Sequence, residues 1–288
     1  MIPRGFIQEW RAVSPWPEFR QVEQDLVISR ALCDLFSSEK LKGRIAFRGG
    51  TAINKFLFPR PLRYSEDIDL VQLRPEPVGE TLDGIREALG WLGPCKVAQA
   101  VHSMHLFFKF VPEGESKPMK LKVEINTREH GSLLGTKQYA FAMENSWHSA
   151  RVSVESFQTE ELFGTKLRAL LQRRKNRDLF DLYYGFRYLE MNSVSVVEAF
   201  LHYLKMEGLA ISRNEAERRM LEKLRGSLLE DVEPLLPVGI CFDEPEAMRA
   251  FEIVWRELIL NIPGEPWRLT EETLEKLRKG RYPKLLAE

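Results

Sequence analysis

The hydrophobic pattern of this 288-residue chain changes from strand-like to helical near residue 150. Before that point, short segments such as KLKVEIN at 120–126 alternate apolar and polar side chains, which is typical of strands with one buried face. After residue 158, apolar residues recur at i, i+3 and i+4, which indicates packed helices. The change predicts an α/β (α+β) N-terminal domain over 1–155 and a helical C-terminal domain over 156–288.

The order of signals in the N-terminal half predicts a mixed sheet with flanking helices. Helical spacing occurs over 21–37 and again over 80–93, so a helix is expected at each place. The expected strands are RIAF at 44–47, EDIDLVQL at 66–73, KVAQAV, MHLFFKFV, KLKVEIN at 120–126 and RVSVESF at 151–157.

The composition excludes several classes of protein. Lys plus Arg and Asp plus Glu both number 42, so the chain is not a globally basic nucleic-acid wrapper. Its three cysteines are far apart and form no C-x-x-C pair, which argues against a disulfide framework or a thiolate zinc site. Neither a signal-peptide stretch nor a run of about 20 apolar residues is present. A cytoplasmic protein without a membrane partner is therefore expected.

Carboxylates and glycines in the segment 47–71 predict a nucleotide and metal site. Asp67 and Asp69 lie two apart in an expected strand, so both side chains face the same side, and a divalent cation such as Mg²⁺ or Mn²⁺ would offset their repulsion. Gly49 and Gly50 lie between a strand and a helix, where backbone amides bind phosphate. Glu124, in KLKVEIN, is a candidate third carboxylate. There is an alternative for each part of this site. The two glycines could form only a turn, Asp67 and Asp69 could be solvated, and Glu124 could lie on an edge strand and face water.

Six cations and no acid lie between residues 166 and 177 of this neutral chain. They are Lys166, Arg168, Arg173, Arg174, Lys175 and Arg177. Such a cluster can bind nucleotide phosphates or an RNA backbone. Asn176 is expected to divide the helix into 166–175 and 177–188.

The alternative for this basic segment is a solvated helix face. In that case Arg174 would pair with Asp178, and Arg177 with Asp181, at i, i+4 spacing. In that arrangement Asp178 and Asp181 would not pair with the other four cations, which are Lys166, Arg168, Arg173 and Lys175.

Two segments resemble motifs of one family. GGTAINKFLFPRPLRYSEDIDL resembles the first motif of the nucleotidyltransferase fold, and in particular that of the AbiEii/MenT-type toxins. ELFGTKLRALLQRRKNRDLFDLYYGF, at 161–186, resembles the later motif of the same family. The resemblance extends from about residue 40 to 190; beyond it the chain is similar only in being helical.

The resemblance implies a role for each matching residue. It implies that Gly49, Gly50 and Thr51 bind triphosphate oxygens and that Asp67 and Asp69 bind the catalytic metal. Glu124 takes the position of a third carboxylate, which either activates the attacking hydroxyl or completes a metal site. The further residues that it assigns to nucleotide binding are Arg63, Ser65, Lys166, Arg173, Lys175 and Asp178, with Lys166 also a candidate catalytic residue.

The resemblance also implies a function. We expect a metal-dependent nucleotidyltransferase that transfers a nucleoside monophosphate from a nucleoside triphosphate to an acceptor hydroxyl and releases pyrophosphate. It would be the toxin of a bacterial toxin-antitoxin or abortive-infection pair, with tRNA 3′ ends as acceptor and a separately encoded antitoxin. The alternative is a regulatory module that binds GTP or ATP without transferase activity.

Overall fold

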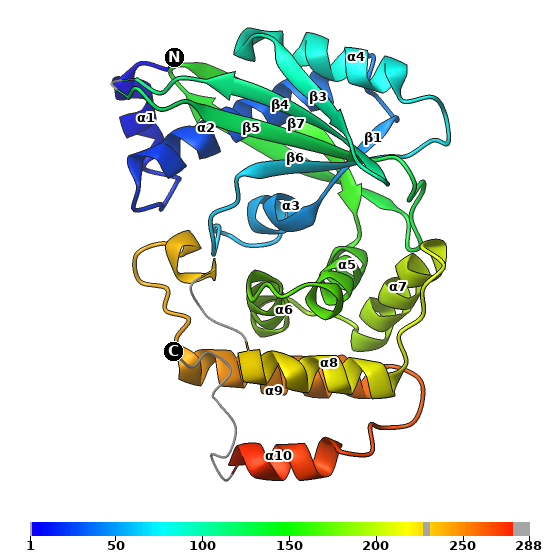
Figure 1. The fold of residues 1–288 in the computed structure, drawn as a ribbon. Coiled ribbons are helices and arrows are strands. Elements are labelled where there is room, and N and C mark those ends of the chain that lie inside the picture. The colour runs from blue at the N-terminus through cyan, green and yellow to red at the C-terminus, as the bar shows by residue number, and fades with distance from the viewer. Residues whose placement is uncertain (1, 114, 227–230, 279–288) are drawn as a thin grey trace. The chain divides into compact units, whose positions relative to one another are not determined.

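The computed structural model describes residues 2–113, 115–226 and 231–278 (Figure 1). Contacts divide the chain into two units, Met1–Gln158 and Thr159–Glu288. Strands occur in the first of these units, and the described part of the second is helical.

The N-terminal unit is built on a sheet whose strands follow the order β3-β4-β5-β2-β1-β7-β6. Their bounds are Ile45–Arg48 (β1), Asp67–Gln72 (β2), Cys95–Gln99 (β3), Ser103–Phe110 (β4), Met119–Asn126 (β5), Thr136–Asn145 (β6) and His148–Phe157 (β7). β2 runs antiparallel to β1 but parallel to β5, so the sheet is mixed. This confirms the predicted fold class and places β2, which carries the aspartates, in the interior of the sheet.

Helices flank this sheet. They are α1 (Arg4–Trp10), α2 (Phe19–Ser37), α3 (Gly49–Phe56) and α4 (Gly79–Ala88). Helix α2 contacts β5, β6 and β7 and buries Ile28, Leu32 and Leu35 completely, whereas α3 contacts β1 and β2 (Figure 1). The helix expected over 80–93 ends at Ala88, and a 3-10 turn follows over Gly90–Leu92. Strand β6 was not among the expected strands.

The described part of the C-terminal unit consists of packed helices. They are α5 (Thr159–Gln172), α6 (Arg177–Tyr188), α7 (Ser193–Met206), α8 (Arg213–Gly226), α9 (Glu244–Glu257) and α10 (Thr270–Arg278). Helices α5 and α7 approach closely at Gly164, where an added Cβ would lie 2.6 Å from the Cβ of Ala199. Residues 173–176 separate α5 from α6, so the predicted interruption is confirmed, but the first helix ends at Gln172 and not at residue 175.

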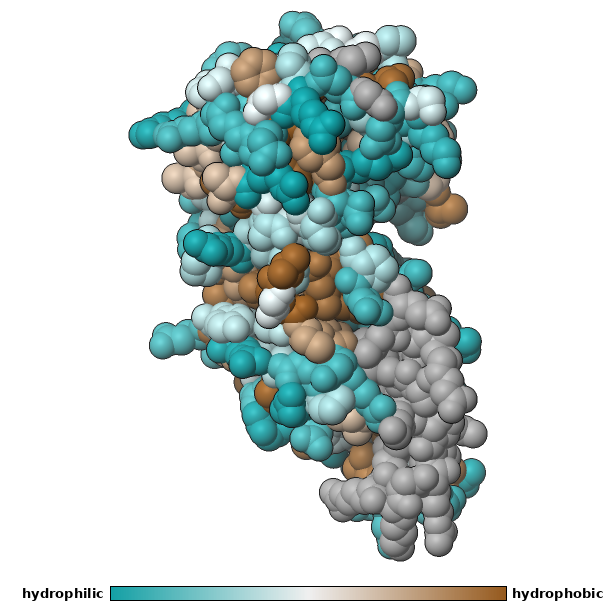
Figure 2. All heavy atoms as spheres, turned by 90° about the vertical axis from the view of Figure 1, so that its left-hand side faces the viewer, coloured by the Kyte–Doolittle hydropathy of each residue, from teal (hydrophilic) through white to brown (hydrophobic). Residues whose placement is uncertain are grey.

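The surface shown in Figure 2 is mainly hydrophilic, with hydrophobic side chains gathered in separate areas. In the part of the chain that the structure describes, the most exposed large hydrophobic residues are Val238 and Val101. No helix there is both long and apolar enough to cross a membrane.

Candidate active site

The turn from β1 into α3 places a glycine against a carboxylate. Gly49 has a φ of +82°, which L side chains rarely adopt, and an added Cβ would lie 2.1 Å from Oδ2 of Asp69. No side chain caps the first turn of α3. The turn therefore combines close backbone approach with a helix N-terminus, the arrangement that favours binding of an anion.

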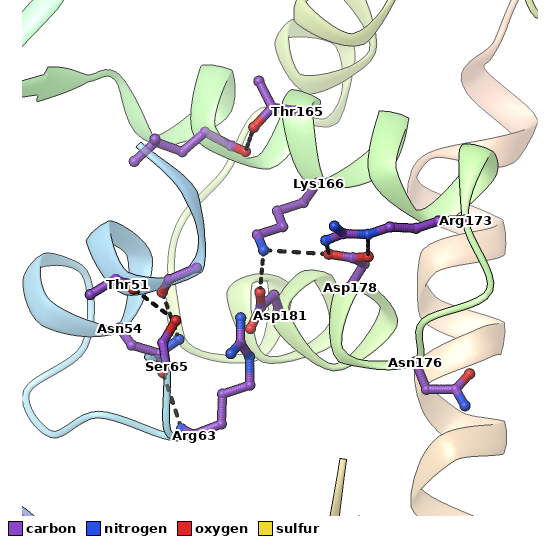
Figure 3. Close-up of polar contacts among 12 residues, drawn as sticks. Thr51, Asn54, Arg63, Ser65, Thr165, Lys166, Arg173, Asn176, Asp178 and Asp181 are labelled. Atoms are coloured by element: carbon purple, nitrogen blue, oxygen red, sulfur yellow. Dashed lines mark hydrogen bonds and ion pairs between the residues drawn. The ribbon is translucent and has the colours of Figure 1, made fainter. Parts of the chain in front are cut away.

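Polar side chains fix this turn to β2. The Thr51 hydroxyl lies 2.6 Å from the carbonyl oxygen of Asp67 and 2.7 Å from Oγ of Ser65 (Figure 3). Because it has a single proton, Thr51 donates to the carbonyl and accepts from Ser65. Thr51 and Ser65 thus hold the start of α3 against the strand that carries the aspartates.

Asn54 organises the loop between α3 and β2. Its Nδ2 donates to the carbonyl of Gly50 at 3.0 Å, and its Oδ1 accepts from the backbone N–H groups of Leu62 and Arg63. The Arg63 side chain is 2% exposed and donates to the carbonyl of Tyr64 at 3.0 Å. The predicted binding residue Arg63 is therefore buried within this loop.

Strand register brings the three predicted carboxylates together. Asp69 is paired with Glu124 on β5, and Asp67 with Lys122, so all four side chains share one face of the sheet. His105 on β4 extends the row, because it is paired with Glu124 and its Nε2 lies 3.4 Å from the carboxylate. Since β5 lies between β4 and β2, the edge-strand alternative for Glu124 is wrong.

A lysine lies between two of these carboxylates. The Nζ of Lys122 is 2.9 Å from Asp67 and 3.1 Å from Glu124. Burial acts to lower the pKa of Lys122, but its hydrogen bond to Asp67 and the surrounding carboxylates outweigh burial and raise that pKa. Lys122 therefore supplies positive charge beside the three carboxylates Asp67, Asp69 and Glu124.

The same lysine determines the ionisation of Glu124. Burial acts to raise the pKa of Glu124, but attraction and hydrogen bonding to Lys122, with help from His105 and Ser103, lower it below its ordinary value. Glu124 is thus ionised at neutral pH and is a weak base.

The donor set fits a divalent cation bound with help from a substrate. Carboxylate oxygens of Asp67 and Glu124 already converge on a cationic group, the Lys122 ammonium. Over the described residues, no three His, Cys, Asp or Glu side chains are arranged to hold a metal ion. Mg²⁺ commonly takes one or two protein carboxylates and completes its shell with phosphate oxygens and water, and Asp67 and Asp69 suit that mode.

The C-terminal unit contains a buried cluster of charges. Lys166 on α5 has a side chain that is 7% exposed, and its Nζ lies 2.9 Å from Asp181 and 3.4 Å from Asp178 (Figure 3). Arg173 binds Asp178 through two hydrogen bonds of 2.7 and 2.8 Å. Burial acts to raise the pKa of Asp178, but Lys166 and Arg173 outweigh it and lower that pKa.

These contacts correct the solvated-face alternative. Asp178 is bound by Lys166 and Arg173 and not by Arg174, because α5 ends at Gln172 and the chain turns before α6 begins. Arg168 likewise has an acidic partner, Glu207, at 3.1 Å. Arg174 and Lys175 are exposed.

A second layer of contacts supports this cluster. The side chain of Asn176 donates to Asp231, whose carboxylate also accepts from the Asn176 backbone N–H. The Nζ of Lys223 donates to the carbonyl of Arg173, and burial lowers the pKa of Lys223 to about 8. The segment between α5 and α6 is therefore anchored at both of its ends, by Lys223 at Arg173 and by Asp231 at Asn176.

Residues 30–252 match the family model described as the nucleotidyl transferase AbiEii toxin of type IV toxin-antitoxin systems. This range includes the carboxylates on β2 and β5 and the buried charges on α5 and α6. The chain belongs to the AbiEii nucleotidyltransferase toxin family. A comparison with curated proteins gave no match.

Solved structures share the fold of this AbiEii protein. MenT4, a nucleotidyltransferase toxin from Mycobacterium tuberculosis, is 18% identical, with a TM-score of 0.62 and coverage of 98% of this chain and 100% of that chain. JHP933 from Helicobacter pylori is 14% identical, with a TM-score of 0.51 and coverage of 91% of this chain and 98% of that chain. At these identities the likeness shows the fold alone.

The structure adds residues that sequence analysis of this AbiEii chain did not select. Lys122, His105 and Asn54 each contact a predicted site residue or its loop. Lys122 and Glu124 are two apart in one expected strand, so their shared face was predictable. The pairing of His105 with Glu124 depends on the register between β4 and β5, which the sequence does not show.

Proposed function

We propose that this AbiEii protein uses a divalent metal, Mg²⁺ or Mn²⁺, to transfer a nucleoside monophosphate from a nucleoside triphosphate to the 3′ end of tRNA. The observation that supports this most is the row of carboxylates on β2 and β5 beside the positive-φ turn at Gly49. A bound metal would offset charge on the triphosphate and on the entering and leaving oxygens.

In this proposal the N-terminal unit binds the triphosphate and the metal. Backbone amides of Gly49, Gly50 and Thr51 bind phosphate oxygens, and Asp67 and Asp69 bind the cation. The Thr51 hydroxyl is already used in holding α3 to β2, so Thr51 contributes its amide. Ser65 acts in the same attachment.

Glu124 acts as an ionised carboxylate. An efficient general base has a pKa near the working pH, whereas Lys122 lowers the pKa of Glu124. This favours a role as a metal partner over a role as the base that deprotonates the acceptor.

The C-terminal unit contributes cations in this proposal. Lys166, Arg173 and Lys175 bind phosphates of the nucleotide or of the RNA. Asp178 is fully buried and bonded to Lys166 and Arg173, so it acts by positioning these two cations. Arg63 is buried and donates to the carbonyl of Tyr64, so it supports nucleotide binding by positioning the loop before β2.

Growth inhibition tests the proposal in cells. Expression of the wild type without its antitoxin is expected to stop growth, and Asp67→Ala or Asp69→Ala is expected to abolish this effect. Asp83→Ala is a matched control, because Asp83 is exposed and pairs only with Arg86 among the described residues. Full toxicity of the Asp67→Ala and Asp69→Ala variants would contradict the proposal.

A further inference from the structure

The lysines of strands β3, β4 and β5 all lie on one face of the sheet. Strand pairing places Lys96 opposite Phe107, and Phe107 opposite Lys122. Lys109 is likewise paired with Lys120. Because directly paired residues point to the same side, these side chains share the face that carries Glu124 and the aspartates of β2. The part of this face that lies beyond the carboxylates is called the lysine face below, and it consists of Lys96, Phe107, Lys109 and Lys120.

The two sides of these three strands differ in burial and in charge. Leu106, Phe108 and Leu121 alternate with the residues of the lysine face and are completely buried. On the lysine face the three lysines are exposed and Phe107 is half-buried. Within the described parts of the chain, none of these three lysines forms an ion pair. The lysine face is therefore a local concentration of positive charge in a chain whose net charge is zero.

Phe107 lies among these cations. The Nζ of Lys120 is 5.4 Å from the centroid of the Phe107 ring, and the ring of His105 meets it edge-on with centroids 6.0 Å apart. Nucleobases stack on aromatic side chains of this kind, and lysines beside them bind the phosphates of the strand. Single-stranded RNA is bound in this way on sheets that carry aromatic side chains on an open face. The chemistry of the lysine face thus fits a single strand of nucleic acid.

The order of the strands places the lysine face on the acceptor side of the candidate active site. Phe107 is paired with Lys122, which is paired with Asp67, so Phe107 lies two strands, or about 10 Å, from Asp67. The glycine turn follows β1, on the other side of β2. In an in-line displacement the entering oxygen lies opposite the leaving pyrophosphate. Because we propose that the glycine turn binds the triphosphate, the acceptor enters from the side of β5, where the lysine face lies.

We infer that the lysine face binds the single-stranded 3′ end of the RNA acceptor, with a base stacked on Phe107 and the three lysines bound to phosphates. The inference rests on the proposed function and adds to it the surface that holds the acceptor. Phe107 favours RNA over an acidic protein segment, because a base stacks on the ring whereas the negative face of the ring repels a carboxylate.

The test measures equilibrium binding of a labelled single-stranded RNA dodecamer to the full chain, without triphosphate, over a range of salt concentrations. Lys96→Gln is expected to reduce the slope of log K against log salt by about 0.7, which corresponds to the loss of one phosphate contact. Phe107→Leu is expected to weaken binding by about tenfold without changing that slope. Phe107→Trp, which restores an aromatic ring, should bind at least as tightly as wild type.

Strand β6, at the other edge of the sheet, offers matched controls. Lys137 is exposed there, and Phe141 is half-buried with the Nζ of Lys55 5.8 Å from its ring centroid. Lys137→Gln should leave the salt slope unchanged, and Phe141→Leu should leave the affinity unchanged. These variants match Lys96→Gln and Phe107→Leu in chemistry but lie outside the lysine face.

Two results would overturn the inference. One is that each variant of the lysine face binds the dodecamer with the same affinity and salt slope as its control on β6. The other is that polyglutamate competes as well as unlabelled RNA, which would assign the lysine face to an acidic protein.

Kinetics separate this inference from the proposed function. If wild type transfers label to RNA while Lys96→Gln and Phe107→Leu leave KM for RNA unchanged, the inference fails and the proposed function stands. If the expected binding pattern is found but wild type transfers nothing, the lysine face is supported as an RNA-binding surface and the proposed function fails.

Discussion

Gly49 and Asp69 are packed so closely that a methyl group on Gly49 would lie 2.1 Å from the Asp69 carboxylate. The contact joins the turn that precedes α3 to the strand that carries the predicted metal ligands. The turn that we propose to bind phosphate and the carboxylate that we propose to bind metal therefore constrain each other's positions.

We predict that Gly49→Ala lowers nucleotide transfer by roughly 100-fold, because it displaces Asp69 from its place beside the turn. Gly135→Ala is the matched control. Gly135 has a similar φ, +85°, but an added Cβ there meets nothing within 4 Å. Both variants should incur a backbone cost of about 1 kcal/mol, which denaturant unfolding would measure. Only Gly49→Ala should lose activity. Equal activity of the two variants would show that the close contact does not matter.

Lys122→Met is expected to make stability depend on divalent cations. Without the ammonium, Asp67 and Glu124 repel each other, and the free energy of unfolding should fall by about 1–2 kcal/mol in chelator. Adding Mg²⁺ should raise the melting temperature of this variant more than that of wild type. Lys109→Met, on the neighbouring strand β4, serves as the control. An identical response to Mg²⁺ in all three proteins would refute this role of Lys122.

We predict that substitution of two adjacent arginines in the C-terminal unit lowers the free energy of unfolding by different amounts. Arg173→Met should lower the free energy of unfolding by about 2–3 kcal/mol, because it removes two hydrogen bonds from the fully buried Asp178. Arg174→Met should cost less than about 0.5 kcal/mol, since Arg174 is exposed. Chemical denaturation of both variants measures the difference. Similar values for the two would be inconsistent with the assigned pairing.

Because Glu23 is buried, we predict that the free energy of unfolding of the protein depends on pH. Glu23 is 1% exposed, and burial raises its pKa from 4.5 to about 7. The folded state thus favours the neutral acid, so wild type loses stability as the pH rises from about 4.5 to 7 and no further above that. Glu23→Gln should be more stable than wild type by up to about 3 kcal/mol at pH 8 and equal to it near pH 4. A stability difference that does not change with pH would contradict this prediction.

Local patterns predicted the parts of the site that lie within single segments. The glycine turn, the aspartates of β2 and the break at Asn176 all follow from residue spacing over a few positions. Contacts between segments were not predictable in the same way. The pairing of Asp178 with Arg173 depends on where α5 ends, and the row from His105 to Asp69 depends on strand order.

Transfer of label from a nucleoside triphosphate to RNA tests the central claim most directly. Purified protein is incubated with Mg²⁺, each labelled triphosphate in turn and total tRNA, beside Asp69→Asn and the surface control Asp83→Asn. We predict that wild type and Asp83→Asn label the RNA and that Asp69→Asn does not. Tight nucleotide binding without transfer by wild type, or undiminished transfer by Asp69→Asn, would contradict the account.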